Sequence, residues 1–378
     1  MALTPIRRVV TGNDERGRSK VVWDCPSPGT HETNFKGRGH TDFWVWRETP
    51  PPLDGTEDAG TWNDEFPGPP DGGHLRVVHW LAKTGESPPN EAYKEPETHG
   101  RTWDRGGGNH YNRSYMHKTQ SVDYGIMLSG ERIIELDDCK LVMKPGDIVV
   151  QVGAWHLWDS SKIGCMMAFD MISAEFADGP AGTAQGNDPV VRRRPDHKLP
   201  PGVKPQRRIV TIDREAGKSS LVGDGPSPDV RTDPARPGFA LQRMWVVDGA
   251  PAKIVFETLH LPHTLEPPAK GSVLNVVTFP PDAAWKGKVG AAEVAAYFKS
   301  MGSPGASAYS LQAPHPYMQK TCTLDFCIVV EGEIVLVLDT QEVPLKAGEI
   351  VVQRGTNHAW SNRSGKPAVV AIASHGAK

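Results

Sequence analysis

Two matching stretches of sequence decide the fold. Residues 121–160 read SVDYGIMLSGERIIELDDCKLVMKPGDIVVQVGAWHLWDS, and residues 323–362 read TLDFCIVVEGEIVLVLDTQEVPLKAGEIVVQRGTNHAWSN. They align without a gap at a shift of 202 residues. A second repeat opens each half, because Arg7–Thr11 recurs as Arg207–Thr211 at a shift of 200. The chain is therefore an internal duplication, with the same unit built twice.

The repeated unit is predicted to consist of strands. Gly125–Leu128 and Asp147–Val150 are apolar runs too short for helices, rich in β-branched residues and bounded by turn residues. The 39 glycines and 34 prolines of the chain favour many turns between such strands. One helix is expected at Ala291–Met301, where Gly302 gives a stop signal. Residues 49–70 have no period, and we expect an extended loop that covers something.

The length of 378 residues suggests two domains. Residues 176–205 are rich in glycine, proline and charge and read as a linker. The sequence thus predicts an N-terminal domain at 1–175, a linker at 176–205 and a C-terminal domain at 206–378.

Charge and composition limit the class of partner. A net charge of −3 offers no general attraction for nucleic acid or anionic lipid, which leaves a small molecule as the expected partner. The N-terminus has no apolar signal region and no stretch is long enough to span a membrane, so we expect a cytoplasmic protein. Five cysteines without C-x-x-C pairs are read as reduced thiols.

Polar side chains gather on one predicted strand of the first unit. A period of two places His117, Thr119, Ser121 and Asp123 on the same face. A second histidine, His156, follows a glycine turn at the entrance of a later strand.

These residues resemble the two motifs of the cupin superfamily. Its first motif reads His-x-His, three or four residues, Glu, six residues, Gly; here the frame is His117-x-Thr119, Asp123 and Gly130. Its second motif ends in Gly-x-x-His, which matches Gly153–His156. The resemblance covers about 60 residues in each half. It implies an all-β protein, a bicupin with two tandem cupin barrels (double-stranded β-helix, or jelly roll) and a few short peripheral helices.

The resemblance also implies a divalent metal in the first barrel. Thr119 replaces one family histidine and Asp123 replaces the glutamate, which leaves His117, Asp123 and His156 as ligands. Two imidazoles and a carboxylate suit non-haem iron, and Fe(II) is favoured. Manganese, zinc or nickel is chemically possible with the same ligands.

The matching positions of the second barrel have a weaker donor set, because an amide replaces one imidazole. We expect weaker metal binding there, with a nearby histidine as a compensating ligand. The residues are Gln319, Asp325, His358 and His315.

Further candidates surround the first metal site. Four are expected to bind substrate, although the aromatic ones also suit an ordinary core: Trp158, Tyr124, Gln151 and Trp155. Three precede the metal strand and are candidate catalytic residues, as proton donors or as a clamp for a carboxylate: His110, Arg113 and Tyr115.

The expected function is that of a metal-dependent enzyme acting on a small aromatic or carboxylate-bearing molecule, with an iron dioxygenase as the first interpretation. A decarboxylase, lyase or hydrolase on the same scaffold is the first alternative. A non-catalytic bicupin that binds a small molecule is an alternative of another class, because fold does not fix function. A homodimer is a further expectation by analogy.

Overall fold

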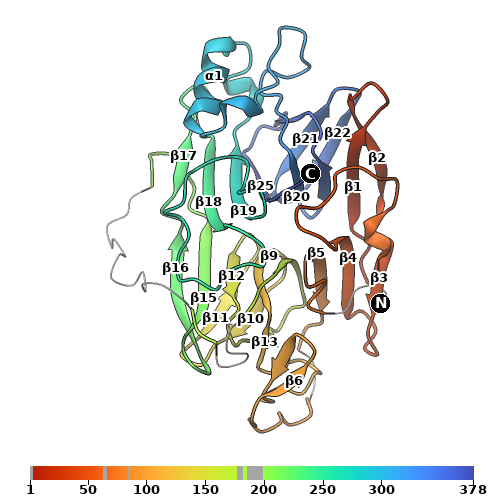
Figure 1. The fold of residues 1–378 in the computed structure, drawn as a ribbon, viewed down its shortest axis with the longest axis vertical. Coiled ribbons are helices and arrows are strands. Elements are labelled where there is room, and N and C mark those ends of the chain that lie inside the picture. Colours follow the sequence, from red (N-terminus) through yellow and green to blue (C-terminus); the bar gives the residue numbers. More distant parts are fainter. Residues whose placement is uncertain (1–2, 63–65, 84–85, 177–181, 185–198) are drawn as a thin grey trace.

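The computed structural model describes residues 3–62, 66–83, 86–176, 182–184 and 199–378. Most of the predicted linker at 176–205 therefore lies outside the described residues, and the domain boundaries stay a prediction. The described chain is almost entirely β, with two large sheets stacked along the long axis of the molecule (Figure 1). This confirms the all-β class.

Each large sheet has eight strands. In sheet order, the first contains β16 (Lys218–Pro226), β15 (Arg207–Glu215), β12 (Ile148–Val152), β9 (Ser121–Ser129), β14 (Cys165–Ser173), β5 (Gly73–Trp80), β4 (Gly39–Trp46) and β3 (Gly29–Glu32). The second contains β17 (Val230–Thr232), β18 (Ala240–Val247), β19 (Ser272–Phe279), β25 (Ala368–Gly376), β20 (Thr323–Glu331), β23 (Ile350–Arg354), β1 (Arg7–Asn13) and β2 (Ser19–Pro26).

Three small sheets and four short helical segments complete the described chain. The small sheets are β11 (Lys140–Met143), β10 (Arg132–Glu135) and β13 (Leu157–Ser160); β22 (Glu342–Lys346), β21 (Glu333–Leu338) and β24 (His358–Ser361); and β6 (Glu97–His99), β7 (Thr102–Asp104) and β8 (His117–Thr119). The helical segments are α1 (Ala291–Ser300) and the 3-10 turns η1 (Ala59–Thr61), η4 (Asp282–Ala284) and η5 (Pro304–Ala306).

The predicted helix is confirmed within one residue of its expected end. Val294, Tyr297 and Phe298 of α1 are buried against the second barrel, and the chain leaves the helix through Gly302 at φ +72°. A side chain other than glycine is strained in this left-handed region, so the glycine stop has a conformational cause. In Figure 1 the helix lies at the outer end of the second half.

Each barrel is closed by a large sheet facing a small one, and a third core lies between the two large sheets. Met127 and Val149 of the first large sheet pack with Ile134 and Trp158 of its small sheet. The opposite face of the same strands is also buried, because it packs against the second large sheet. Strands covered on both faces read as continuous apolar runs, which accounts for Ile148–Val150.

The two halves exchange their first hairpins. β1 pairs in parallel with β23, although Arg8 and its partner Ile350 stand at opposite ends of the chain. β15, which opens the second half, pairs in the same way with β12 of the first. In Figure 1 the red β1 and β2 accordingly lie beside the blue strands, and the green β15 lies beside the yellow β12.

The exchange is fastened by the same polar contacts twice. Ser19 N donates to Asp339 Oδ2 at 2.8 Å, and Ser219 N donates to Asp137 Oδ2 at 2.8 Å. Both serines are buried, so each backbone N–H finds a charged acceptor in an aspartate of the other half. The first repeats in the sequence, around Arg7 and Arg207, are therefore the segments that join the halves.

A buried ion pair is a third contact that holds the exchanged hairpin in place. Lys118 Nζ lies 2.6 Å from Asp213 Oδ2, with side chains 0% and 1% exposed, and Asp213 Oδ1 accepts from Trp155 N at 3.0 Å. Asp213 stands on the exchanged β15, whereas Lys118 and Trp155 adjoin the two motif histidines. The hairpin of one half thus supports the predicted metal site of the other.

Within the described ranges, no helix is both long and apolar enough to cross a bilayer. The cytoplasmic location and the homodimer stay predictions.

Replacing Asp213 by Asn should lower the free energy of unfolding by about 3–5 kcal/mol, because the Lys118 ammonium loses its buried carboxylate. Chemical denaturation measures this. The matched control is Glu215→Gln on the same strand, whose partner Lys218 is 69% exposed and which should cost less than about 1 kcal/mol. Equal losses in the two variants would contradict the role given to the buried pair.

Candidate functional site

The two motif histidines meet across a backbone bridge. His117 N donates to His156 O at 2.9 Å and His156 N donates to His117 O at 2.9 Å, so the residues are direct cross-strand partners. Their ring centroids are 4.2 Å apart. The structure therefore brings together two of the three predicted metal ligands, from β8 and from the entrance of β13.

Both imidazoles are held in the form that binds a metal. His117 Nδ1 lies 2.8 Å from the Tyr115 carbonyl and His156 Nδ1 lies 2.9 Å from the Ala154 carbonyl. A carbonyl only accepts, so each Nδ1 carries the proton and each Nε2 keeps its lone pair. Burial lowers the pKa of His117 to about 4 and that of His156 well below its usual value, which keeps both rings neutral.

Asp123 faces the interior of the same barrel. It stands opposite Gln151 and Met171 in the sheet, is 3% exposed, and has an Oδ1 without a hydrogen-bond partner. Burial, with Asp170 adding to it, raises the pKa of Asp123 to about 7. An orphaned buried carboxylate oxygen is what a cation or a proton would satisfy.

The three predicted ligands are not the tightest set of such groups. Among the described residues, the one trio with ligand atoms all within 4.8 Å of one another is His31, His40 and Asp42, at the β3–β4 edge. Arg76 Nε already lies 2.7 Å from Asp42 Oδ1, so this carboxylate has its cation. The ligand set of His117, Asp123 and His156 stays a proposal.

Two of the four predicted substrate residues lie inside the first barrel and two lie outside it. Trp158 and Gln151 belong to the interior: the Trp158 ring lies 6.0 Å from that of His156, and Gln151 is buried with both amide atoms unpartnered. Trp155 packs outside, with Trp103 and Met116. Tyr124 points toward the second half, where its hydroxyl lies 2.7 Å from Ser272 Oγ, so it does not line the first barrel.

The candidate catalytic residues lie in the loop before β8. His110 adopts a positive φ of 52° and packs its ring 3.9 Å from that of Tyr115. Burial raises the pKa of the Tyr115 hydroxyl. Arg113 Nη2 lies 2.8 Å from Glu135 and Nη1 lies 3.5 Å from Asp159, so its guanidinium already has carboxylate partners within the protein.

A different arginine faces the two histidines. Arg132 on β10 is 3% exposed and its Nε and Nη1 have no hydrogen-bond partner. Its guanidinium interacts with the Cys165 thiol and with the charge of Asp159, and among the described residues no carboxylate lies at ion-pair distance from it. Its guanidinium lies 4.3 Å from the Trp80 ring and 5.0 Å from the Trp158 ring. Its charge contributes to the low pKa of both histidines. The sequence signal was available, because Arg132 alternates with the inward Ile134.

The loop at 49–70 reaches both halves. Phe66 places its ring 6.3 Å from that of His117, and Leu53 N donates to the carbonyl of Lys378 at 3.0 Å. The expectation that this segment covers something is met at these two ends.

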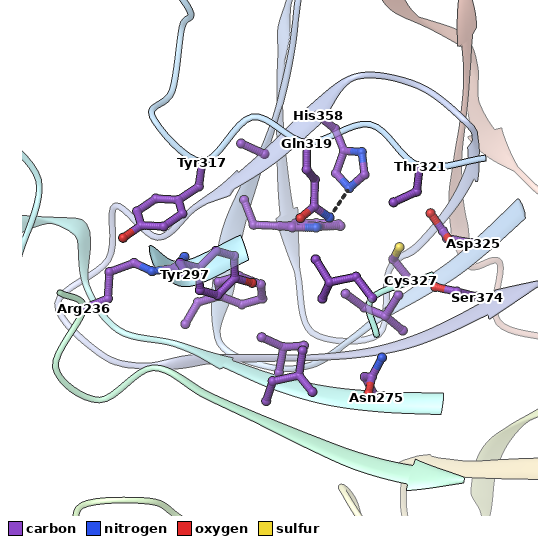
Figure 2. A pocket seen from close by; sticks show the side chains of 17 residues that line it. Arg236, Asn275, Tyr297, Tyr317, Gln319, Thr321, Asp325, Cys327, His358 and Ser374 are labelled. Carbon is purple, nitrogen blue, oxygen red and sulfur yellow. Dashed lines mark hydrogen bonds between the residues drawn. The ribbon is translucent and has the colours of Figure 1, made fainter. Parts of the chain in front are cut away.

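The second barrel encloses a cavity of about 60 Å³ (Figure 2). Gln319, Asp325 and His358, the three matched positions, all line it, and Gln319 Nε2 lies 3.3 Å from His358 Nε2. Burial lowers the pKa of His358 and raises that of Asp325. The other lining residues are Arg236, Leu241, Leu265, Asn275, Val277, Phe279, Tyr297, Tyr317, Thr321, Cys327, Ala359, Trp360, Ile372 and Ser374.

His315 does not reach this cavity. It is 1% exposed, its ring centroid lies 5.6 Å from that of Trp285, and its Nδ1 accepts from Tyr317 N at 3.2 Å. The sequence predicts His315 and Gln319 on one face of a strand. Residues 313–318 instead form turns before the short bridge at Gln319, so a period of two does not apply between His315 and Gln319.

The architecture is that of two jelly-roll barrels, each with polar groups inside. Residues 312–374 match the family model of the cupin domain, and the first half repeats the same topology. Residues 312–374 therefore carry a cupin domain, and the chain as a whole has two barrels of the same topology.

Curated relatives share a short region. Phomopsin biosynthesis cluster proteins C' and D of Diaporthe leptostromiformis are each 54% identical over 48 residues, which is 12% of this chain and 25% of theirs. Oryzines biosynthesis cluster protein J of Aspergillus oryzae is 48% identical over 50 residues, 13% of this chain and 28% of that protein. The chain thus spans about a quarter of the length of these relatives.

Solved structures are similar at low identity. A cupin 2 conserved barrel domain protein from Leptotrichia buccalis is 8% identical, with a TM-score of 0.35 over 80% of this chain and 83% of that one. A Geobacillus kaustophilus protein is 11% identical, with a TM-score of 0.38 over 99% and 98%. A variant of oxalate decarboxylase from Bacillus subtilis is 11% identical, with a TM-score of 0.31 over 80% and 68%. These values carry no functional argument.

The raised pKa of Asp123 predicts a pH-dependent stability. Between about pH 4 and pH 7 the folded chain keeps a proton that the unfolded chain has released, so stability falls as the pH rises through this window. In chelator-treated protein, Asp123→Asn should therefore raise the free energy of unfolding at pH 8 by up to about 4 kcal/mol, with little effect at pH 4.

Chemical denaturation at both pH values measures the effect, with Asp54→Asn in an exposed position as the control. A variant that is no more stable than the natural chain at pH 8 would show that Asp123 is not desolvated.

Proposed function

We propose that this protein is a metal-dependent enzyme that binds its metal in the first barrel and acts on a small carboxylate-bearing molecule. The observation that carries the proposal is the pair His117 and His156, two neutral imidazoles whose Nδ1 atoms are fixed by backbone carbonyls. Fixed tautomers of this kind are typical of metal-ligating histidines.

The donor types of His117, His156 and Asp123 suit a divalent ion, which would have to draw the carboxylate and the two imidazoles together, because their ligand atoms do not all lie within 4.8 Å of one another. His117 and His156 would supply two Nε2 ligands, and Asp123 offers a buried carboxylate oxygen without a partner. Two imidazoles and one carboxylate are the donor set of non-haem iron, and we propose Fe(II) and an oxygenation reaction. When bound, such an ion supplies Lewis acidity and open positions for substrate and oxygen.

The substrate class follows from the charge of the barrel. The Arg132 guanidinium is buried, with two nitrogens unpartnered and with Cys165 and the charge of Asp159 to stabilise it, so an anion that joined it would offset the cost of its burial. Arg38 strengthens the positive charge nearby, because its guanidinium lies 3.6 Å from the same Trp80 ring. A substrate carboxylate at Arg132 would lie on the side of Trp158, whose ring gives it an apolar wall and excludes water.

The residues that would transfer protons lie in the loop before β8. The low pKa of His110, caused by burial, leaves its ring neutral and able to accept a proton at pH 7. The names of the curated relatives place them in biosynthesis clusters, which supports a role of this chain in small-molecule metabolism.

Purified protein should contain about one iron per chain by plasma mass spectrometry. His156→Ala should lose it, because a single imidazole and a carboxylate do not hold the ion tightly. The matched control is His358→Ala, the same position of the second barrel, which should keep the metal. Equal metal loss in both variants, or none in either, would contradict a centre in the first barrel.

Arg132→Gln should weaken the binding of the carboxylate substrate at least tenfold, since a charge-assisted hydrogen bond contributes about 1.5–3 kcal/mol. The measurement is KM or Kd at constant metal content, with Arg113→Gln as a control of the arginine whose partners are Glu135 and Asp159. If Arg113→Gln weakens substrate binding more than Arg132→Gln does, then Arg113 is the residue that binds the carboxylate.

A further inference from the structure

The second barrel repeats the backbone of the histidine bridge with a different side chain. Gln319 N donates to His358 O at 2.8 Å and His358 N donates to Gln319 O at 2.9 Å, as His117 and His156 do in the first barrel. The frame is therefore the same in both halves. What differs is that an amide stands where the first barrel has an imidazole.

The Gln319 amide forms a hydrogen bond with the His358 lone pair that a metal would need. His358 Nδ1 lies 2.9 Å from the Thr356 carbonyl and so carries the proton, which leaves Nε2 as an acceptor. Gln319 Nε2 lies 3.3 Å from it and donates, as Figure 2 shows. An amide nitrogen is no metal ligand at neutral pH, so the bridge is closed by a hydrogen bond instead of an ion.

The cavity nevertheless has unmet hydrogen-bonding groups. Four of its polar atoms are buried without a partner: the donors Arg236 Nη2 and Trp360 Nε1, and the acceptors Asn275 Oδ1 and Asp325 Oδ1. Their residues are 3–6% exposed. Leaving such groups unsatisfied is costly, so this set indicates a polar ligand.

Arg236 is held rigidly at one end of the cavity. Its guanidinium lies 3.6 Å from the Tyr317 ring and 4.4 Å from the Tyr297 ring. Asp233 fixes Nε at 2.7 Å and also accepts from the Tyr317 hydroxyl at 2.9 Å. Figure 2 shows Arg236 with the two tyrosines at one end and Asp325, with Asn275, at the other.

We propose that the second barrel is a metal-independent binding site for a small carboxylic acid that carries a hydroxyl group. Arg236 Nε is paired with Asp233, so its unpartnered Nη2 is the atom that binds the carboxylate. The hydroxyl donates toward Asn275 or Asp325, and Trp360 Nε1 is a further donor to the ligand. A volume of about 60 Å³ has room for roughly four to six non-hydrogen atoms, at about 10–15 Å³ each. Acids of the size of glycolate and lactate fit this limit, and the apolar wall of Leu241 and Val277 excludes longer charged chains.

The test is calorimetric titration of the whole, chelator-treated protein with glycolate. We expect one site in the second barrel whose Kd changes less than twofold when metal is restored. Arg236→Gln should weaken it at least tenfold, and the site must persist in Arg132→Gln, which assigns it to the second barrel. Trp360→Phe keeps an aromatic ring and removes only the N–H, and it should weaken glycolate binding about fivefold. This variant tests the proposal on its own if Arg236→Gln does not fold.

Gln319→His supplies the reciprocal test, because it rebuilds the pair of imidazoles found in the first barrel. Titration with zinc should show one more equivalent per chain in this variant than in the natural protein. The proposal is overturned if glycolate, acetate and lactate all fail to bind, if binding requires metal, if Trp360→Phe binds as the natural chain does, or if the natural second barrel already takes up zinc.

Discussion

The exchange of hairpins between the halves is the constraint on which the remaining structure depends. Val9 of β1 belongs to the core of the second barrel, and Ile209 of β15 belongs to the core of the first. Each exchanged strand also supports the other half's histidine. Asp213 accepts from the backbone N–H beside His156, and Thr11 hydrogen bonds to Thr356, whose carbonyl orients His358. Neither site is complete within its own half of the sequence.

The two barrels show how one frame can serve two kinds of chemistry. The paired backbone hydrogen bonds and the Nδ1 contacts are the same at His156 and His358, so the strand entrance orients the imidazole whatever lies opposite. The residue opposite the histidine then decides whether a metal can bind. With His117 opposite, both imidazoles keep a free Nε2 lone pair, whereas Gln319 donates a hydrogen bond to the Nε2 lone pair of His358. Arg132 and Ile334 differ at matched positions, so the first barrel has a buried cation on this strand, whereas the buried cation of the second barrel's cavity is Arg236, which precedes β18.

Much of the fold was predictable because it rests on local patterns. The gapless repeat, the glycine turns and the strand period predict the class, the duplication and the inward position of Asp123. Counted from His156, period two does not place Gln151 on the same face, and its pairing with Asp123 across the sheet is what turns it inward. The exchange was not predictable, since both copies of a repeated segment are equally compatible with either barrel. Tyr124 follows Asp123 and so faces the opposite side of β9, which period two already implied. Arg132 alternates with Ile134 just as clearly. The sequence does not show, however, that the two carboxylates at ion-pair distance belong to Arg113 and that none lies so close to Arg132 among the described residues.

The parallel pairing of β1 with β23 has a consequence for the nascent chain. Arg8 and Ile350 are 342 positions apart, so at about 5–20 residues per second the first strand waits roughly 20–70 s on the ribosome for its partner. β12 waits only for β15, which begins at Arg207. The first barrel can therefore be completed in mid-translation, using a strand borrowed from the second. The β1–β2 hairpin then keeps one edge of β1 unpaired until β23 has been synthesised.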